Sequence, residues 1–218
     1  MSCDFSFAHY EHILRKALRS KYAVFCLGDF VALKRRPKKV LLLRHDIDFV
    51  PERAVAMAAV EKKLGVKATY FVRVHADYNP FNFRVWSFLD RIRGLGHEIG
   101  LHHENLDFAV VSGRSAASVI ASEKKVLEAV TGFEVRGCAA HNDFTPSNNL
   151  EFWKKHSPKE FGFKYEAYGP QFKDFTYVSD SLGKWRGGKC PCNLMGTEDA
   201  VYLSTHPNYW YLENYHTF

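Results

Sequence analysis

The sequence lacks any apolar run long enough for a transmembrane helix. Its longest such stretch, residues 54–60, falls far short of the roughly 20 residues that a membrane-spanning helix needs. The first residues also lack the basic and then apolar pattern of a secretory signal peptide. We therefore expect a cytoplasmic protein without stable membrane insertion. Repeats and low-complexity segments are missing too, and 46% hydrophobic with 25% charged residues excludes a wholly disordered or collagen-like chain.

Cysteine is scarce, with five residues among 218. An odd number of cysteines without an export signal predicts reduced thiols rather than a disulfide framework. Cys190 and Cys192 form a CxC pair, but no second pair follows at the spacing of a zinc finger. A structural zinc site is therefore not expected at this pair.

The charge balance is positive, because 30 Lys and Arg against 24 Asp and Glu give a net charge of +6. Much of the surplus lies in residues 34–39, which we interpret as a solvated approach to a strand. A platform for single-stranded nucleic acid would place aromatic residues between the basic ones, and this tract has none. We therefore expect no nucleic-acid partner; the alternative, binding through this tract, predicts strongly salt-dependent retention on DNA.

Short apolar runs alternate with amphipathic segments along most of the chain. This alternation predicts βαβ units and a parallel sheet. We expect one domain over residues 1–218, with a helical N-terminal extension at 1–39 and the core at 40–206. The expected strands lie at 40–43, 68–72, 98–101, 134–140, 161–168, 174–179 and 200–205, and the expected helices at 8–19, 51–64, 82–95 and 115–130.

Polar residues gather where the expected strands end. The carboxyl ends of parallel strands open on one face of a sheet, and that face holds the active site of α/β proteins. Carboxylates and imidazoles that converge there would make a divalent-metal site with spare acid and base groups. The groups are Arg44-His45-Asp46-Ile47-Asp48, His102-His103-Glu104, His141-Asn142-Asp143, Ser179-Asp180 and Thr205-His206.

Asp46 and Asp48 point to the same side if their strand stays extended. Two carboxylates so close repel each other unless a cation lies between them, and a metal or Arg44 could supply that charge. The alternative is that they cap the helix expected to begin near Pro51.

His102 and Glu104 likewise share one side of an extended strand, whereas His103 lies on the other. A lone His102 could equally be a hydrogen-bonded structural residue. Trp185 beside Arg186 could form a sugar platform with an anion clamp, or belong to a turn. His206, between a strand and a proline, is a candidate general acid or base.

Three strings of sequence carry a family resemblance. Residues 65–72 read Gly-Val-Lys-Ala-Thr-Tyr-Phe-Val, and residues 96–100 read Gly-His-Glu-Ile-Gly with His102 shortly after them. Leu203-Ser204-Thr205-His206 is similar to a late Leu-x-His string, displaced by one residue. In this order, over residues 40–206, the segments resemble the polysaccharide deacetylase family, the NodB-homology carbohydrate esterases.

The resemblance implies a fold and an activity. The fold would be an α/β distorted (β/α) barrel of about seven parallel strands. The activity would be metal-dependent hydrolysis that removes an acyl group from an N-acylated amino sugar or a related carbohydrate precursor in polysaccharide biosynthesis. The metal would be a divalent ion, most commonly Zn²⁺, and the carbohydrate could be linked to a nucleotide or a lipid.

The resemblance also implies residue roles. Asp46 becomes the catalytic base, His206 the general acid, and Asp48, His102 and Glu104 the metal ligands. Arg44 and Asp180 would tune the base and the acid, and Trp185 and Arg186 would shape the sugar pocket. The other residues expected around the ligands or the substrate are His45, His103, His141, Asn142 and Asp143.

The chain also departs from the family pattern, as a divergent His-Asp-x-Asp variant. Ile47 separates the two aspartates that are adjacent in the family, so their roles as base and ligand could be exchanged. Leu106 stands where the family has its second ligand histidine, so Glu104, His103, His141 or His206 would have to replace it. Two alternatives follow: a carbohydrate-binding or regulatory module of the same fold, and a hydrolase of a non-sugar C–N amide bond.

Overall fold

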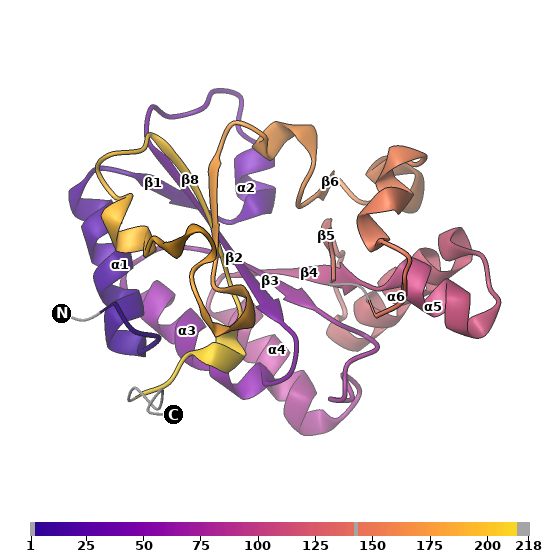
Figure 1. Ribbon diagram of the computed structural model, residues 1–218. Coiled ribbons are helices and arrows are strands. Elements are labelled where there is room, and N and C mark those ends of the chain that lie inside the picture. Colours follow the sequence, from indigo (N-terminus) through magenta and orange to yellow (C-terminus); the bar gives the residue numbers. More distant parts are fainter. Residues whose placement is uncertain (1–2, 142–143, 213–218) are drawn as a thin grey trace.

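The computed structural model describes residues 3–141 and 144–212. One parallel sheet, curled into a half-barrel, forms its centre (Figure 1). Its strands follow the order β6-β5-β4-β3-β2-β8-β7. The short β1 pairs with the first residues of β2, before the point where β3 begins to pair with that strand. The strands are β1 (Ala23–Phe25), β2 (Val40–Ile47), β3 (Thr69–Val72), β4 (Glu98–His103), β5 (Gly137–Ala140), β6 (Tyr165–Glu166), β7 (Thr176–Ser179) and β8 (Ala200–Thr205). The predicted distorted (β/α) barrel type is confirmed.

Helices α1, α3, α4 and α6 lie side by side along one face of the sheet, and α2 packs on β2 (Figure 1). Pro51 occupies the first turn of α3, where its missing N–H costs no hydrogen bond. The helices are α1 (Phe7–Arg19), α2 (Leu27–Val31), α3 (Pro51–Lys63), α4 (Phe83–Gly94), α5 (Asn105–Ser112) and α6 (Ala116–Thr131). In the described part of the chain, no helix has the length and apolarity to cross a bilayer.

Two segments of the chain differ from the expected pattern. The N-terminal extension is not wholly helical, because β1 joins the sheet between α1 and α2. The strand expected at 161–168 shrinks to β6, because Ser157 and Glu160 form a capping box and start a short 3₁₀ helix. The 3₁₀ helices are η1 (Asn149–Lys154), η2 (Pro158–Phe161), η3 (Pro170–Phe172), η4 (Ser181–Gly183), η5 (Arg186–Gly188), η6 (Pro191–Asn193) and η7 (Pro207–Tyr209).

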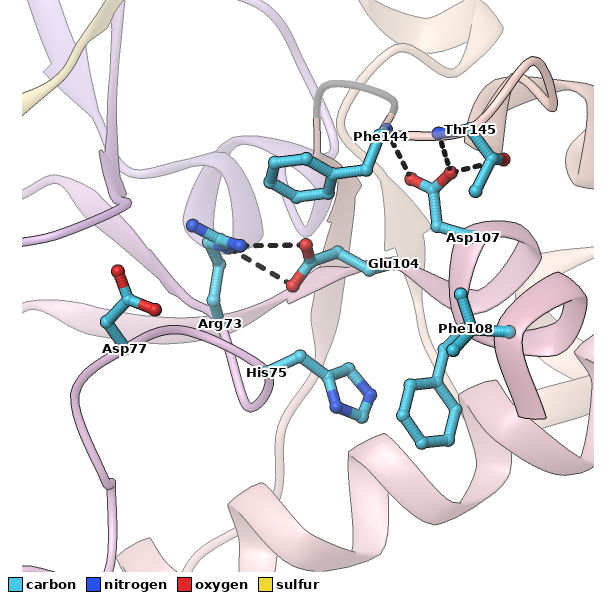
Figure 2. Close-up of a pocket in the computed structure, with 9 residues that line it drawn as sticks. Arg73, His75, Asp77, Glu104, Asp107, Phe108, Phe144 and Thr145 are labelled. Atoms are coloured by element: carbon cyan, nitrogen blue, oxygen red, sulfur yellow. Dashed lines mark hydrogen bonds and ion pairs between the residues drawn. The ribbon is translucent and has the colours of Figure 1, made fainter.

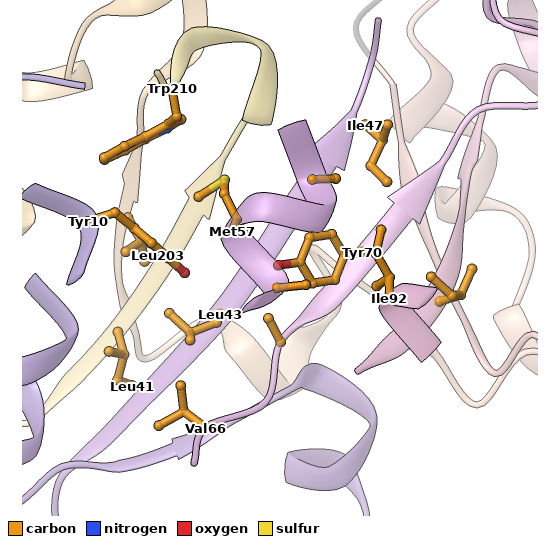
Figure 3. Packing of buried hydrophobic residues seen from close by; sticks show 14 of the residues in the cluster. Tyr10, Leu41, Leu43, Ile47, Met57, Val66, Tyr70, Ile92, Leu203 and Trp210 are labelled. Atoms are coloured by element: carbon orange, nitrogen blue, oxygen red, sulfur yellow. The ribbon is translucent and has the colours of Figure 1, made fainter. Parts of the chain in front are cut away.

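Strand β2 is buried on both faces, which explains its continuous apolar run. Leu41 and Leu43 face the helices and pack in one cluster with Tyr10 of α1 and Met57 of α3 (Figure 3). Leu42 faces the inside of the half-barrel and belongs to a second cluster. Odd-numbered residues of β2 therefore point to the helices and even-numbered ones to the inside.

Glu61 of α3 is a fully buried carboxylate on the helical side of the sheet. Tyr10 donates a hydrogen bond to its Oε1 at 2.5 Å, and Tyr70 donates to its Oε2 at 2.6 Å. His45 Nε2 lies 2.6 Å from Oε1, and His45 Nδ1 lies 2.6 Å from Thr205 Oγ1. This network ties α1, α3, β2, β3 and β8 together.

Candidate metal centre and active site

Arg44 and Asp46 form a buried ion pair at the carboxyl end of β2. Arg44 Nε donates to Asp46 Oδ1 and Arg44 Nη2 donates to Asp46 Oδ2, both at 2.8 Å. Burial would raise the pKa of Asp46, but the charges of Arg44 and His206 and the hydrogen bonds from Arg44 hold it well below its usual range. Asp46 is therefore an ionised carboxylate with a fixed orientation.

Asp48, His102 and His141 bring three donor atoms within 4.8 Å of one another. Asp48 Oδ1 lies 3.6 Å from His102 Nε2 and 3.7 Å from His141 Nε2. This oxygen is buried, yet it accepts no hydrogen bond from any of the described residues. Because a buried carboxylate oxygen is costly without a partner, its environment suits a cation.

The two imidazoles present nitrogen atoms to Asp48. His102 Nδ1 lies 3.0 Å from the carbonyl oxygen of Ala139, so Nδ1 carries the proton and Nε2 is free to bind a metal. Burial lowers the pKa of His102 well below its usual value, which keeps the ring neutral. His141 Nδ1 lies 3.3 Å from Glu104 Oε1, so a carboxylate lies behind this second ring. An oxygen and two imidazole nitrogens are a donor set that fits zinc or a similar divalent ion.

Glu104, expected as a metal ligand, does not belong to this cluster of three donors and instead contacts His141. Arg73 binds it through two hydrogen bonds, from Nη2 to Oε1 at 2.8 Å and from Nε to Oε2 at 3.1 Å (Figure 2). Burial would raise the pKa of Glu104, but contacts with His141 and Arg73 lower it to about 2. Both oxygens of Glu104 are thus occupied by protein groups, and His141 takes the place nearest Asp48.

His206 reaches the same cluster from the end of β8. Its Nε2 lies 3.8 Å from Asp46 Oδ2 and 3.8 Å from Asp48 Oδ2. Its Nδ1 lies 2.6 Å from Asp180 Oδ1, and Trp210 Nε1 donates to Asp180 Oδ2 at 2.7 Å. Burial would lower the pKa of His206, but the hydrogen bond and charge of Asp180 raise it to about 9.

A cavity of about 270 Å³ opens beside Glu104. Phe108 and Phe144 supply apolar walls, and Arg73 and His75 supply polar ones (Figure 2). The sequence reasoning missed these four residues. Arg73 could have been found, because it directly follows β3 and so lies at the same carboxyl edge of the sheet. The cavity is also lined by Asp77, Asp107, Val111 and Thr145.

Two predicted site histidines point away from the cluster. His45 belongs to the Glu61 network on the helical face. His103 Nδ1 lies 2.9 Å from Asn105 Oδ1, and Trp153 Nε1 donates to His103 Nε2 at 3.0 Å. Side chains alternate along a strand, so the neighbours of Asp46 and His102 face the helices.

The remaining predicted residues have other surroundings. Trp185 packs against Phe5 and Trp210, with ring centroids 5.3 Å and 6.0 Å away, and Arg186 is exposed. Asn142 and Asp143 lie outside the described residues.

Comparisons with solved structures identify similar folds. A family 4 carbohydrate esterase from Bacillus anthracis matches with a TM-score of 0.50 and 20% identity, over 91% of this chain and 76% of that one. IcaB from Ammonifex degensii matches with a TM-score of 0.52 and 16% identity, over 72% of each chain. A CE4 family pseudoenzyme from Bacillus anthracis matches with a TM-score of 0.52 and 16% identity, over 79% of this chain and 56% of that one.

This chain therefore spans only 56% to 58% of the pseudoenzyme structures that it matches. A scan against models of protein families finds no match, and a search of curated proteins finds none either. The fold is that of the CE4 polysaccharide deacetylases, and a carbohydrate esterase and a pseudoenzyme share it.

Proposed function

We propose that this chain, with its CE4 deacetylase fold, is a metal-dependent hydrolase that removes an acyl group from an N-acylated amino sugar or a related carbohydrate. The observation that carries the proposal is the cluster of Asp48, His102 and His141. It lies between the carboxylate of Asp46 and the imidazole of His206, at one edge of the sheet. A base, an acid and a set of metal donors thus surround one point.

In this proposal Asp48, His102 and His141 hold the cation. His141 thereby replaces the histidine that Leu106 removes, and Glu104 orients His141 instead of binding the ion, because Arg73 occupies both of its oxygens. A divalent ion, with zinc the best fit to one oxygen and two nitrogens, would supply polarisation of the acyl carbonyl and of the attacking water.

The protein's own groups move the protons. Asp46, ionised and oriented by Arg44, accepts a proton as the water oxygen attacks the acyl carbon. The C–N bond then breaks, and His206 donates its proton from Nε2 to the departing amine nitrogen. Asp180 holds His206 Nδ1 and stabilises the charged ring, so Nε2 stays directed at the reacting atoms.

The neighbouring cavity is the proposed place for the sugar. Phe108 and Phe144 can pack against the apolar face of a pyranose ring, while Arg73 and His75 supply hydrogen bonds. The net charge of +6 and the cytoplasmic location that we expect favour a phosphate-bearing precursor, linked to a nucleotide or a lipid.

Metal content and turnover on acetylated amino sugars test the proposal together. We expect Asp48→Ala, His102→Ala and His141→Ala each to remove one equivalent of zinc and abolish turnover. Glu104→Gln should keep the zinc equivalent with lower affinity, by about 10- to 100-fold. His156→Ala, a partly exposed histidine outside the cluster, serves as the control. Zinc content that is the same in the control and in all three ligand variants would contradict the proposal.

The second candidate function is that of a carbohydrate-binding module without turnover. Two observations favour it: Leu106 stands in place of a ligand histidine, and the fold is similar to that of a pseudoenzyme. Protein that binds an acetylated amino sugar in calorimetry but hydrolyses none, with or without added zinc, would support the module. A parallel screen with cyclic amides distinguishes the third alternative, hydrolysis of a non-sugar amide bond.

A further inference from the structure

We propose a second metal centre, a structural zinc site formed by Cys3, His9, Cys190 and Cys192. One ligand atom from each of the four residues lies within 4.8 Å of the others. Cys3 Sγ lies 3.5 Å from Cys192 Sγ, and Cys190 Sγ lies 3.5 Å from His9 Nε2. These four residues belong neither to the Asp48 cluster nor to its cavity.

The separations match those of a tetrahedral site. With Zn–S bonds of about 2.3 Å and a Zn–N bond of about 2.0–2.1 Å, tetrahedral angles place two sulfurs about 3.7 Å apart and a sulfur and a nitrogen about 3.5 Å apart. Both observed contacts, at 3.5 Å, lie near these values. A disulfide would require sulfurs at about 2.05 Å, so Cys3 and Cys192 are free thiols in this structure.

His9 already has the orientation of a zinc ligand. Its Nδ1 lies 2.5 Å from the backbone carbonyl oxygen of Asp4, and a carbonyl only accepts hydrogen bonds. The proton therefore resides on Nδ1, which leaves the lone pair of Nε2 directed towards Cys190. His9 itself is held in the first turn of α1, where its backbone N–H donates a hydrogen bond to Oγ of the N-cap residue Ser6 at 3.1 Å.

Three thiolates and one imidazole select zinc over magnesium or calcium, which prefer oxygen. Cys190 and Cys192 flank Pro191 at the start of η6, so the turn presents both sulfurs on one side. Four protein ligands close the coordination shell, as in structural zinc sites, and leave no position for a substrate. The centre is therefore structural and distinct in chemistry from the oxygen and nitrogen cluster at Asp48.

A zinc ion here would fasten the start of α1 to the C-terminal part of the chain. The same N-terminal segment pairs with Tyr211, because Phe7 N donates to Tyr211 O at 2.9 Å and Tyr211 N donates to Phe5 O at 3.0 Å. Phe5 packs against Trp210 with ring centroids 5.3 Å apart, and Trp210 donates to Asp180. The site would thus stabilise the N-terminal segment that packs against Trp210, the residue that donates to Asp180.

Cobalt substitution of the reduced full-length protein tests the site. A tetrahedral cobalt ion bound by thiolates absorbs in the near ultraviolet through sulfur-to-cobalt charge transfer, and ligands without sulfur do not produce this band. We expect one equivalent of cobalt to give it, and zinc to displace it. Cys3→Ser, at an exposed position, should lower the band by about one third because one of three thiolates is lost. Cys192→Ser should weaken it or remove it.

Two controls keep the result independent of the proposed hydrolase. Cys138→Ser changes a buried cysteine far from the cluster in the β5 strand and should leave the band unchanged. Asp48→Ala should also leave it unchanged, whatever its effect on hydrolysis. Absence of the band in the full-length protein, or a band that Cys3→Ser and Cys192→Ser leave intact, would overturn the proposal. A Cys3–Cys192 disulfide that forms equally fast with and without zinc would overturn it too.

Discussion

The Glu61 network offers a test of how the fold supports the site. We consider Glu61→Gln, which keeps the volume of the side chain but replaces one acceptor oxygen with a donor and removes the charge. In the native protein Tyr10, Tyr70 and His45 all direct hydrogen bonds at this carboxylate. The amide of glutamine has a single acceptor oxygen, so it cannot accept hydrogen bonds at both of the positions that the carboxylate oxygens occupy.

The expected loss follows from these contacts. A hydrogen bond to a charged group contributes about 1.5–3 kcal/mol and a neutral one about 0.5–1.5 kcal/mol. Replacing three charge-assisted bonds with at most two neutral ones therefore costs about 3 kcal/mol or more of the free energy of unfolding. For a chain of this size, that corresponds to a decrease in Tm of roughly 6–12 °C.

Urea unfolding followed by circular dichroism measures this difference. Glu52→Gln, on the same helix but exposed, is the matched control and should change the free energy of unfolding by less than about 0.5 kcal/mol. A Glu61→Gln variant within about 1 kcal/mol of the wild type would refute the reasoning, because it would mean that the buried charge contributes no net stability.

The acid dependence gives an independent check. Burial would raise the pKa of Glu61, but His45, His97 and Tyr10 lower it below the usual value of 4.5. A carboxyl group with a lowered native pKa contributes stability that is present above the unfolded pKa and is lost as the pH falls through the native one. The difference in the free energy of unfolding between the wild type and Glu61→Gln should therefore be largest near neutral pH and should decrease as the pH drops below 4.5.

Two further predictions concern the acid and the sheet. In the metal-free protein Asp180→Asn should move the pKa of His206, followed by NMR, from about 9 towards 6.5. In the zinc-loaded protein the same change should reduce turnover by about 10-fold or more. An unchanged pKa of His206 would contradict its pairing with Asp180. Gly137→Ala should destabilise the fold by about 1–3 kcal/mol, because its Cβ would lie 2.0 Å from Tyr165 Cζ. Gly94→Ala is the control in the same thermal-melting assay, because its Cβ would meet no atom within 4 Å among the described residues outside its own helix.

The sequence strings at 65–72 and 96–100 have structural explanations that a sequence alone does not provide. Glu98 accepts hydrogen bonds from Gly28 N at 2.9 Å and from Thr69 Oγ1 at 2.7 Å. His97 Nδ1 accepts from Ala68 N at 3.2 Å. Polar residues of both strings therefore hold β3, β4 and α2 in place. The metal donor near the second string is His102, which lies two residues after it.

The third donor of the candidate metal cluster could not be chosen from the sequence. Glu104 and His141 both follow strands and both offer suitable atoms. The choice depends on Arg73, which binds both oxygens of Glu104, and on the approach of β5 to β4, which brings His141 to 3.7 Å from Asp48. Neither contact has a signal in local sequence, because each joins segments that are distant along the chain.

The sequence by itself determined the alternation of strands and helices and the edge of the sheet where Asp46, Asp48, His102 and His206 lie. These follow from periodicity, and side-chain alternation also explains why their neighbours face the helices. Only the tertiary structure decided which groups meet: the pairing of Arg44 with Asp46, the place of His141, and the approach of Cys3 to Cys192 across 189 residues. The physical reason is that local propensity acts over a few residues, whereas the curvature of the sheet and the packing of its ends set distances between segments far apart.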